Sequence, residues 1–345
     1  MLEPFPSFRR YFQDQGTLHL LHSYDLIVFT YTHRSLSYSS NMPPSKPKPS
    51  EIAAEAKKTY IPYIRSACPQ WPTTSYLCHS DSLRDQQIRE PKQYTFAFLE
   101  RDPVDLALEW TASENNRPIP VIMPAHERRP GGDWEAGVMQ PEECLARRST
   151  LFACLTTPAS DNITSNNYPI PERAGIISQN VVVFRNGPEK YEPWSEYKSL
   201  PIISVPTVKR PKLDSSGKKY SFKPERELVK ASIKTALRIA IFYGYDKIVI
   251  GTYGLGPGFK NPPEEVANIW RELLVRDNEF NQQFSAIIFA FEPCEGAGGS
   301  SSSNPSSSSK SSKSSSSSSK TSFTHELDIF RQTFKPANLH GAFKS

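Results

Sequence analysis

The chain has 345 residues, enough for one large domain or two of average size. Only 37% of its residues are hydrophobic and 31 are proline, so the composition favours one folded core with disordered segments over two cores. The net charge of +5 is compatible with an anionic ligand, but it does not indicate DNA or RNA. We therefore expect no direct nucleic-acid readout.

The cysteines and histidines show no spacing typical of a disulfide framework or a metal site. The five cysteines are widely separated, with no CxxC pair, and the seven histidines form no H-x-x-x-H pattern. We expect a reducing compartment, no metal and no cofactor. No run reaches the roughly 18–20 apolar residues of a membrane span. These observations predict a soluble protein of the nucleus and/or cytoplasm, with no membrane association.

Residues 1–49 differ in composition from the rest of the chain. They show no sustained hydrophobic period and end in a linker that reads P-P-S-K-P-K-P, which suits neither a helix interior nor a central strand. We interpret them as disordered, or as a mis-assigned extension ahead of a start at Met42. A single domain is expected over residues 50–335, followed by a tail at 336–345.

The first half of this domain alternates predicted helices and strands. In chain order they are a helix at 51–60, a strand at 94–99, a helix at 104–111 and a strand at 119–123. Ser50 and Asp102 are the expected N-caps of the two helices. Residues 66–93 show no clean period, so we expect a loop there.

The second half continues the same alternation. We expect strands at 181–184, 202–205, 247–250 and 286–291, and helices at 225–243, 263–275 and 323–334. Gly244 is placed to end the helix at 225–243. Residues 295–322 are almost entirely Ser, Gly and Lys, so we predict a disordered insertion within the domain. The alternation favours a three-layer α/β fold with a central sheet.

One stretch carries the strongest indication of chemistry. Residues 129–150 read R-P-G-G-D-W-E-A-G-V-M-Q-P-E-E-C-L-A-R-R-S-T. Gly131 and Gly132 let the backbone approach a ligand closely. Glu142 and Glu143 start a helical pattern, where carboxylates are favoured by the exposed N–H groups. The stretch suits a sugar-phosphate ligand whose glycosidic bond needs a proton; the alternative is a surface loop capped by two acids.

A second glycine-rich loop comes after the strand at 247–250. It contains Gly251, Gly254, Gly256 and Gly258, but it matches neither a Walker A motif nor a G-x-G-x-x-G fingerprint. Its successive N–H groups could ring a diphosphate without a lysine contact. Plain turn geometry is the alternative. Both loops come after apolar strands, at the strand ends where open α/β sheets usually bind ligands.

The motifs together resemble a known family, the microbial-type poly(ADP-ribose) glycohydrolases, which are macrodomain proteins. The resemblance rests on P-G-G…E-E-x-L-x-R-R-S at 130–149, V-V-V-F-R at 181–185, I-G-T-Y-G-L-G-P-G-F-K-N-P-P-E-E-V-A at 250–267, I-I-F-A-F at 287–291 and F-R-Q-T-F at 330–334. The chain resembles a fungal-like, divergent member. The resemblance implies a macrodomain-like fold, with a mixed central sheet flanked by helices and ADP-ribose held across the two loops.

The resemblance also implies roles for individual residues. Glu143 would be the catalytic acid that protonates the leaving ribose oxygen and then activates water, and Glu142 would position the ribose. The expected ligand-binding residues are Gly131, Gly132, Gly254, Gly256, Gly258 and Phe259. The implied activity is hydrolysis of ribose–ribose bonds by a monomer acting on ADP-ribose or poly(ADP-ribose) on modified proteins. Burial and a like-charged neighbour would raise the pKa of such an acid.

Several residues depart from the family pattern. Asp133 replaces a third glycine, Pro141 precedes the glutamate pair, Met123 stands where an Asn is common, and Pro257-Gly258 adds a residue to the second loop. Asp133 should weaken the binding of an anion unless it points away. A non-catalytic ADP-ribose reader is the alternative function, but it needs no paired acids.

Two further features have open interpretations. Trp134 could cover a ligand or pack in the core, and Lys209-Arg210-Pro211-Lys212 could be a nuclear-import patch or, more simply, a solvated basic loop.

Overall fold

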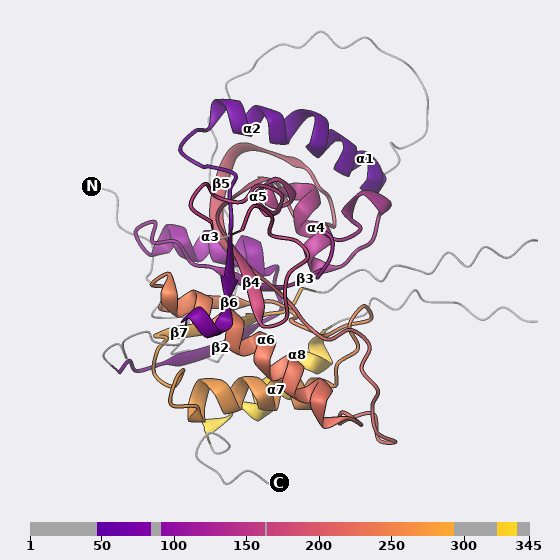
Figure 1. The fold of residues 1–345 in the computed structure, drawn as a ribbon, viewed down its shortest axis with the longest axis vertical. Helices are drawn as coiled ribbons and strands as arrows, with labels where there is room; N and C mark the ends of the chain where they lie inside the picture. The colour runs from indigo at the N-terminus through magenta and orange to yellow at the C-terminus, as the bar shows by residue number, and fades with distance from the viewer. Residues whose placement is uncertain (1–46, 84–90, 163, 293–322, 337–345) are drawn as a thin grey trace, which may run out of the picture. The chain divides into compact units, whose positions relative to one another are not determined.

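The computed structural model describes residues 47–83, 91–162, 164–292 and 323–336 (Figure 1). The predictions for the segment at 1–46, the insertion at 295–322 and the tail from 337 onward lie outside these described residues. The compact unit that contains the predicted domain starts at Lys48. Within the described ranges, no helix combines the length and apolar character needed to cross a membrane.

A seven-stranded mixed sheet forms the centre of this unit, in the order β1-β4-β5-β3-β6-β7-β2. The strands are β1 (Tyr76–His79), β2 (Thr95–Leu99), β3 (Val121–Ala125), β4 (Ala174–Arg185), β5 (Pro193–Pro206), β6 (Lys247–Ile250) and β7 (Ala286–Ala290). Both pairings of β4 are antiparallel, whereas β5, β3, β6, β7 and β2 run parallel to one another. The predicted fold class, a mixed sheet flanked by helices, is therefore confirmed.

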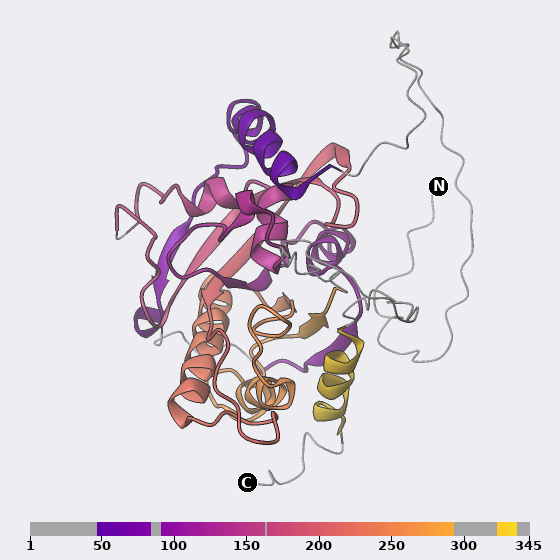
Figure 2. The same cartoon turned by 90° about the vertical axis from the view of Figure 1, so that its right-hand side faces the viewer.

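Helices cover both faces of this sheet (Figure 2). They are α1 (Pro49–Glu55), α2 (Ile61–Ala67), α3 (Pro103–Ser113), α4 (Pro141–Arg148), α5 (Leu151–Leu155), α6 (Lys223–Phe242), α7 (Pro263–Arg271) and α8 (Thr324–Thr333). Figure 2 shows α6, α7 and α8 on one face and α1 to α5 on the other. Short π-helical turns, Ala56–Tyr60 and Glu272–Arg276, join α1 to α2 and extend α7.

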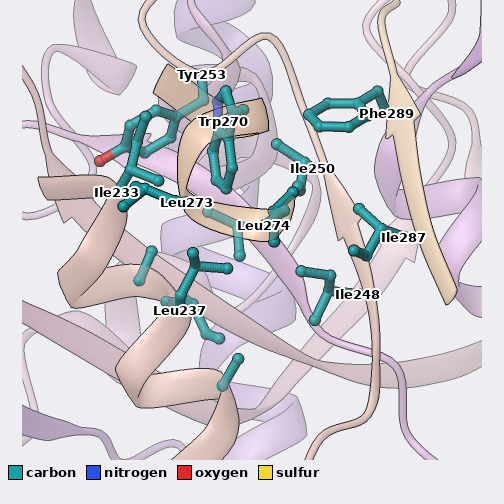
Figure 3. Close-up of a cluster of buried hydrophobic side chains, with 14 of the residues drawn as sticks. Ile233, Leu237, Ile248, Ile250, Tyr253, Trp270, Leu273, Leu274, Ile287 and Phe289 are labelled. Carbon is teal, nitrogen blue, oxygen red and sulfur yellow. The ribbon is translucent and has the colours of Figure 1, made fainter. Parts of the chain in front are cut away.

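The larger core lies between the sheet and α6 to α8. The apolar stripe of α6 includes Ile233 and Leu237, both fully buried. In Figure 3 these side chains meet others from the α7 region and from two strands, namely Trp270, Leu273, Leu274, Ile248, Ile250, Ile287 and Phe289. The helix ends as expected from the sequence, because Gly244 adopts a positive φ of 84°. Periodic burial of one helix face therefore fixes α6 on the sheet.

Three local predictions were wrong. The cap of α1 is Lys48, so Ser50 lies inside the helix. The presumed loop contains the edge strand β1, which is only four residues long. The helix after Glu143 is broken: Ser149 is extended, bridges to Val183 of β4 and separates α4 from α5. The second and third errors arise from contacts that are distant in sequence, whereas the cap of α1 involves a local hydrogen bond from the Lys48 N–H to the Glu51 side chain.

The five parallel strands end at one edge of the sheet. Because they share one direction, the residues that come after them gather there: His126 after β3, Lys209 after β5, Gly251 after β6, Glu292 after β7 and Asp102 after β2. This is the edge at which open α/β sheets bind ligands. The topology therefore brings both glycine loops to one place.

Substitutions on α6 test this packing. Leu237→Ala should lower the free energy of unfolding by about 2–5 kcal/mol, because the fully buried side chain leaves a cavity. Leu228→Ala on the same helix, where the side chain is 41% exposed, should cost less than about 1 kcal/mol. Urea unfolding measures both. Equal losses would contradict the assignment of the buried face.

Candidate active site

The Pro-Gly-Gly turn after β3 adopts a conformation that requires glycine. Gly131 and Gly132 have φ angles of 70° and 60°, in the left-handed region. The N–H of Gly132 donates to the carbonyl of Arg129 at 3.0 Å. A Cβ at Gly132 would lie 2.3 Å from Oε1 of Glu143. The absence of a side chain therefore lets the backbone lie directly against this carboxyl group.

Glu142 joins the glycine turn to the start of α4. Its Oε2 accepts the N–H of His126 at 2.5 Å and its Oε1 accepts the N–H of Gly131 at 3.1 Å. The residue is 4% exposed. Burial raises the pKa of Glu142 well above its usual value and neighbouring Glu143 adds to this, whereas the two backbone donors and Lys209 lower it. Glu142 therefore anchors the loop from within.

Glu143 lies beside it and is also 4% exposed. Its Oε1 accepts the N–H of Asp133 at 3.3 Å. Burial raises the pKa of Glu143, while backbone N–H groups and the charges of Lys209 and Arg147 partly oppose this effect. Such a carboxyl group retains its proton to a higher pH than an exposed glutamate does. This is the property required of a general acid near neutral pH.

The two carboxyl groups line a narrow cleft at the sheet edge. Across the cleft lie Lys209, which comes after β5, and Phe259 of the second glycine loop. Gln140 links the two sides: a Cβ at Gly258 would lie 2.6 Å from its side-chain Cδ. The structure therefore brings the glutamate pair and the second glycine loop together, as expected from the sequence.

The three glycines assigned to the diphosphate have different surroundings. Only Gly258 faces Gln140 of the cleft. A Cβ at Gly254 would lie 3.2 Å from the Asn261 amide, and one at Gly256 would lie 2.7 Å from the Phe323 ring. Gly254 and Gly256 have positive φ angles of 76° and 81°. Glycine at these two positions thus serves the shape of the loop, and contact with a diphosphate stays a prediction.

A second pocket lies next to the cleft, and Pro124 and Pro141 line both. Buried Arg148 lies at its wall and pairs with Asp102 at 2.5 Å and with Asp105 at 3.0 Å. Burial and the charge of Asp102 raise the pKa of Glu292 to about 8. The apolar walls of this pocket include Val104 and Met123.

The charge of Asp133, which departs from the family pattern, is compensated. Arg129 contacts both oxygens of its carboxylate, with Nη1 2.7 Å from Oδ1 and Nη2 2.9 Å from Oδ2. The pair is partly exposed, so solvent weakens it. Asp133 therefore points to Arg129 and presents less charge to an anionic ligand than its sequence position indicated.

Sequence reasoning missed some members of the site and left others open. Lys209 was interpreted as part of a basic surface loop or an import patch, yet it lines the cleft. His126 was not considered, although its backbone N–H holds Glu142. Trp134 is 2% exposed and packs on Phe152 with ring centroids 5.0 Å apart, so it is a core residue. Both residues come shortly after parallel strands, Lys209 after β5 and His126 after β3, and this position could have indicated that they lie at the site.

A mixed sheet between helices, with a buried carboxylate pair on its strand-end loops, defines a macrodomain-like α/β protein. The family model of the microbial-type poly(ADP-ribose) glycohydrolase (PARG) catalytic domain matches residues 50–186, which include both glutamates. Over these residues, the chain is similar to the microbial-type PARG catalytic domain. The second glycine loop lies outside the match.

Solved structures share this architecture. PARG from Thermomonospora curvata is 18% identical, with a TM-score of 0.57 over 83% of this chain and 99% of that one. PARG from Deinococcus radiodurans in complex with ADP-ribose is 21% identical, with a TM-score of 0.51 over 68% of this chain and 91% of that one. At these identities the likeness establishes the shared fold. A comparison with curated proteins gave no match.

The raised pKa of Glu143 predicts a pH-dependent cost. An unfolded glutamate loses its proton near pH 4.3, while the folded protein holds the proton to higher pH. In this window wild-type stability should fall, relative to Glu143→Gln, by up to about 1.4 kcal/mol per pH unit. Urea unfolding between pH 4 and pH 8 measures the difference. Glu127→Gln, at an exposed carboxylate, is the control; equal slopes in all three proteins would contradict the assignment.

Proposed function

We propose that this protein is a poly(ADP-ribose) glycohydrolase that hydrolyses ribose–ribose O-glycosidic bonds, with Glu143 as general acid and base. The observation that carries the proposal is the placement of buried Glu143 in the same cleft as the second glycine loop. The match of residues 50–186 to the PARG catalytic-domain model supports the same activity. The ligand would be ADP-ribose or poly(ADP-ribose) on modified proteins.

The chemistry depends on the state of the Glu143 carboxyl group. Cleavage of a glycosidic bond passes through an oxocarbenium-like state, so the departing oxygen needs a proton. Protonated Glu143 donates that proton as the bond to the anomeric carbon breaks. The resulting carboxylate then accepts a proton from the water that attacks this carbon. Glu143 is thereby returned to its protonated form, and the products are two hydroxyl-bearing sugars.

Glu142 contributes mainly by position. Both of its oxygens accept backbone N–H groups, from His126 and Gly131, so it holds the glycine turn against α4. A carboxylate oxygen can accept a second hydrogen bond, which leaves capacity for a ribose hydroxyl. Gly132 places backbone beside Glu143, where a reacting ribose would lie. The same loop therefore positions the two glutamates and influences the pKa of Glu143.

The adjoining cavity suits the base end of the ligand. It offers apolar walls from Val104 and Met123, and the carboxyl group of Glu292, which can hydrogen-bond to a heterocycle. It shares Pro124 and Pro141 with the cleft. We infer that the ligand spans the two spaces, with its reacting ribose at the glutamate pair.

Glu143→Gln should abolish hydrolysis without abolishing binding. The amide cannot supply a proton, so release of ADP-ribose from poly(ADP-ribose) should fall about 10²–10⁴-fold. Calorimetry should show ADP-ribose binding within a few-fold of wild type, because the side-chain shape is kept. Glu127→Gln is the matched exposed control. Binding without turnover in wild type and variant alike would instead identify an ADP-ribose reader.

The Arg129–Asp133 pair predicts a coupling in ligand affinity. Asp133→Asn should change ADP-ribose affinity by less than about two-fold while Arg129 is present, because the carboxylate is already paired. In an Arg129→Gln background the same change should tighten binding by up to about five-fold, the upper range for an exposed pair. Calorimetric titration of all four proteins gives the coupling. If Asp133→Asn changes ADP-ribose affinity equally with and without Arg129, then Asp133 acts on the ligand independently of Arg129.

A further inference from the structure

Lys209 is held at the cleft by the backbone on both sides of it. The N–H of Arg210 donates to the carbonyl of Phe259 at 2.5 Å. The Asn261 side chain donates to the carbonyl of Val208 at 2.8 Å. These two bonds fasten the segment after β5 to the second glycine loop. The position of the Lys209 backbone is therefore fixed by the loop that would receive a diphosphate.

The Lys209 ammonium is placed for an anion. It lies 5.3 Å from the centroid of the Phe259 ring and lines the cleft with Glu142, Glu143 and Gln140. Within the described ranges, no carboxylate lies at ion-pair distance from it. The charge of Lys209 nevertheless acts on the cleft, because it lowers the pKa values of both glutamates. An ammonium over an aromatic ring, without a carboxylate partner, can accept a new anionic ligand.

The surrounding loop has one lysine, Lys260, which does not line the cleft. The glycines of the loop supply backbone N–H groups, which bind phosphate oxygens only as dipoles. A lysine adds a full positive charge, and a charge-assisted hydrogen bond to phosphate is stronger than a neutral one. We propose that Lys209 is the phosphate-binding cation of this site and makes ligand choice depend on phosphate charge. This inference rests on the proposed function, because it assigns the phosphates of an ADP-ribose ligand to this cleft.

One consequence concerns Phe259. The ammonium now lies over the ring, whose residue is 4% exposed. A phosphate that attracts the Lys209 side chain draws the ammonium from the ring face, which then becomes available to the sugar of the same ligand. Phosphate and sugar recognition are thereby linked through one side chain.

Matched lysine variants test the assignment. Lys209→Met removes the charge and keeps most of the length, and Lys209→Arg restores the charge. Lys212→Met is the control, because Lys212 also lies over an aromatic ring, Phe222, at 5.6 Å, but does not line the cleft. Calorimetry with ADP-ribose, inorganic pyrophosphate and adenosine, at low and high salt, gives the affinities. Thermal unfolding checks that all four proteins are folded.

We expect Lys209→Met to weaken ADP-ribose binding roughly 10- to 100-fold at low salt, the range for a hydrogen bond to a charged group. The salt dependence of binding should decrease, adenosine binding should stay unchanged, and Lys209→Arg and Lys212→Met should resemble wild type. Unchanged ADP-ribose binding in Lys209→Met, or an equal loss for adenosine, would overturn the inference.

The outcomes also separate this inference from the proposed function. If wild type hydrolyses poly(ADP-ribose) but Lys209→Met binds ADP-ribose normally, the proposed function stands and the role of Lys209 fails. If wild type binds pyrophosphate through Lys209 but neither binds nor hydrolyses ADP-ribose polymers, the cation assignment stands and the proposed function fails. If wild type binds neither pyrophosphate nor ADP-ribose, both fail.

Discussion

The burial of two adjacent carboxyl groups is the constraint on which the site depends. Removing a carboxylate from water is costly unless hydrogen bonds or opposite charges compensate it. Here the compensation comes mainly from backbone: the N–H groups of His126 and Gly131 for Glu142, and that of Asp133 for Glu143. The donors of Gly131 and Asp133 come from a turn that is left-handed at two glycines, Gly131 and Gly132. The conformation of the loop therefore also influences the pKa values of the two carboxyl groups.

Charge at this edge of the sheet is arranged in two ways. In the cavity beside the cleft, buried Arg148 is paired with Asp102 and Asp105, which ties α4 to the start of α3. Breaking such a buried pair would leave an uncompensated charge, so the pair holds α4 and the start of α3 firmly together. Around the cleft the basic groups are exposed, and the field they produce there is more easily changed by salt or ligand. The buried pairs support α4, and the exposed basic Lys209 faces the cleft.

Much of this organisation could be predicted from the sequence. The stripe of α6 and the short apolar run of β6 have clear periods, and β6 has the predicted bounds. The glutamate pair was placed at the start of a helix, and α4 begins one residue before it, at Pro141. In each case the signal lies within a few consecutive residues, where hydrophobic period and capping chemistry act.

Other features depend on contacts that no local pattern records. Strand β1 is a short edge strand defined by its antiparallel pairing with β4. The break at Ser149 results from its bridge to Val183. Lys209 belongs to the site because the strand before it lies beside β3, so composition alone suggested only a solvated loop. Asp133 raised a concern about repulsion that its pairing with Arg129, four residues away, reduces. Tertiary neighbours decided the first three features.

The contact between Gln140 and Gly258 has a kinetic consequence. The amide closes the narrow part of the cleft, and its residue immediately precedes α4, which carries the acid pair. The proposed ADP-ribose ligand would reach the glutamate pair only with rotation of that side chain. Its association would then include a first-order rearrangement, and the observed rate would level off at high ligand concentration.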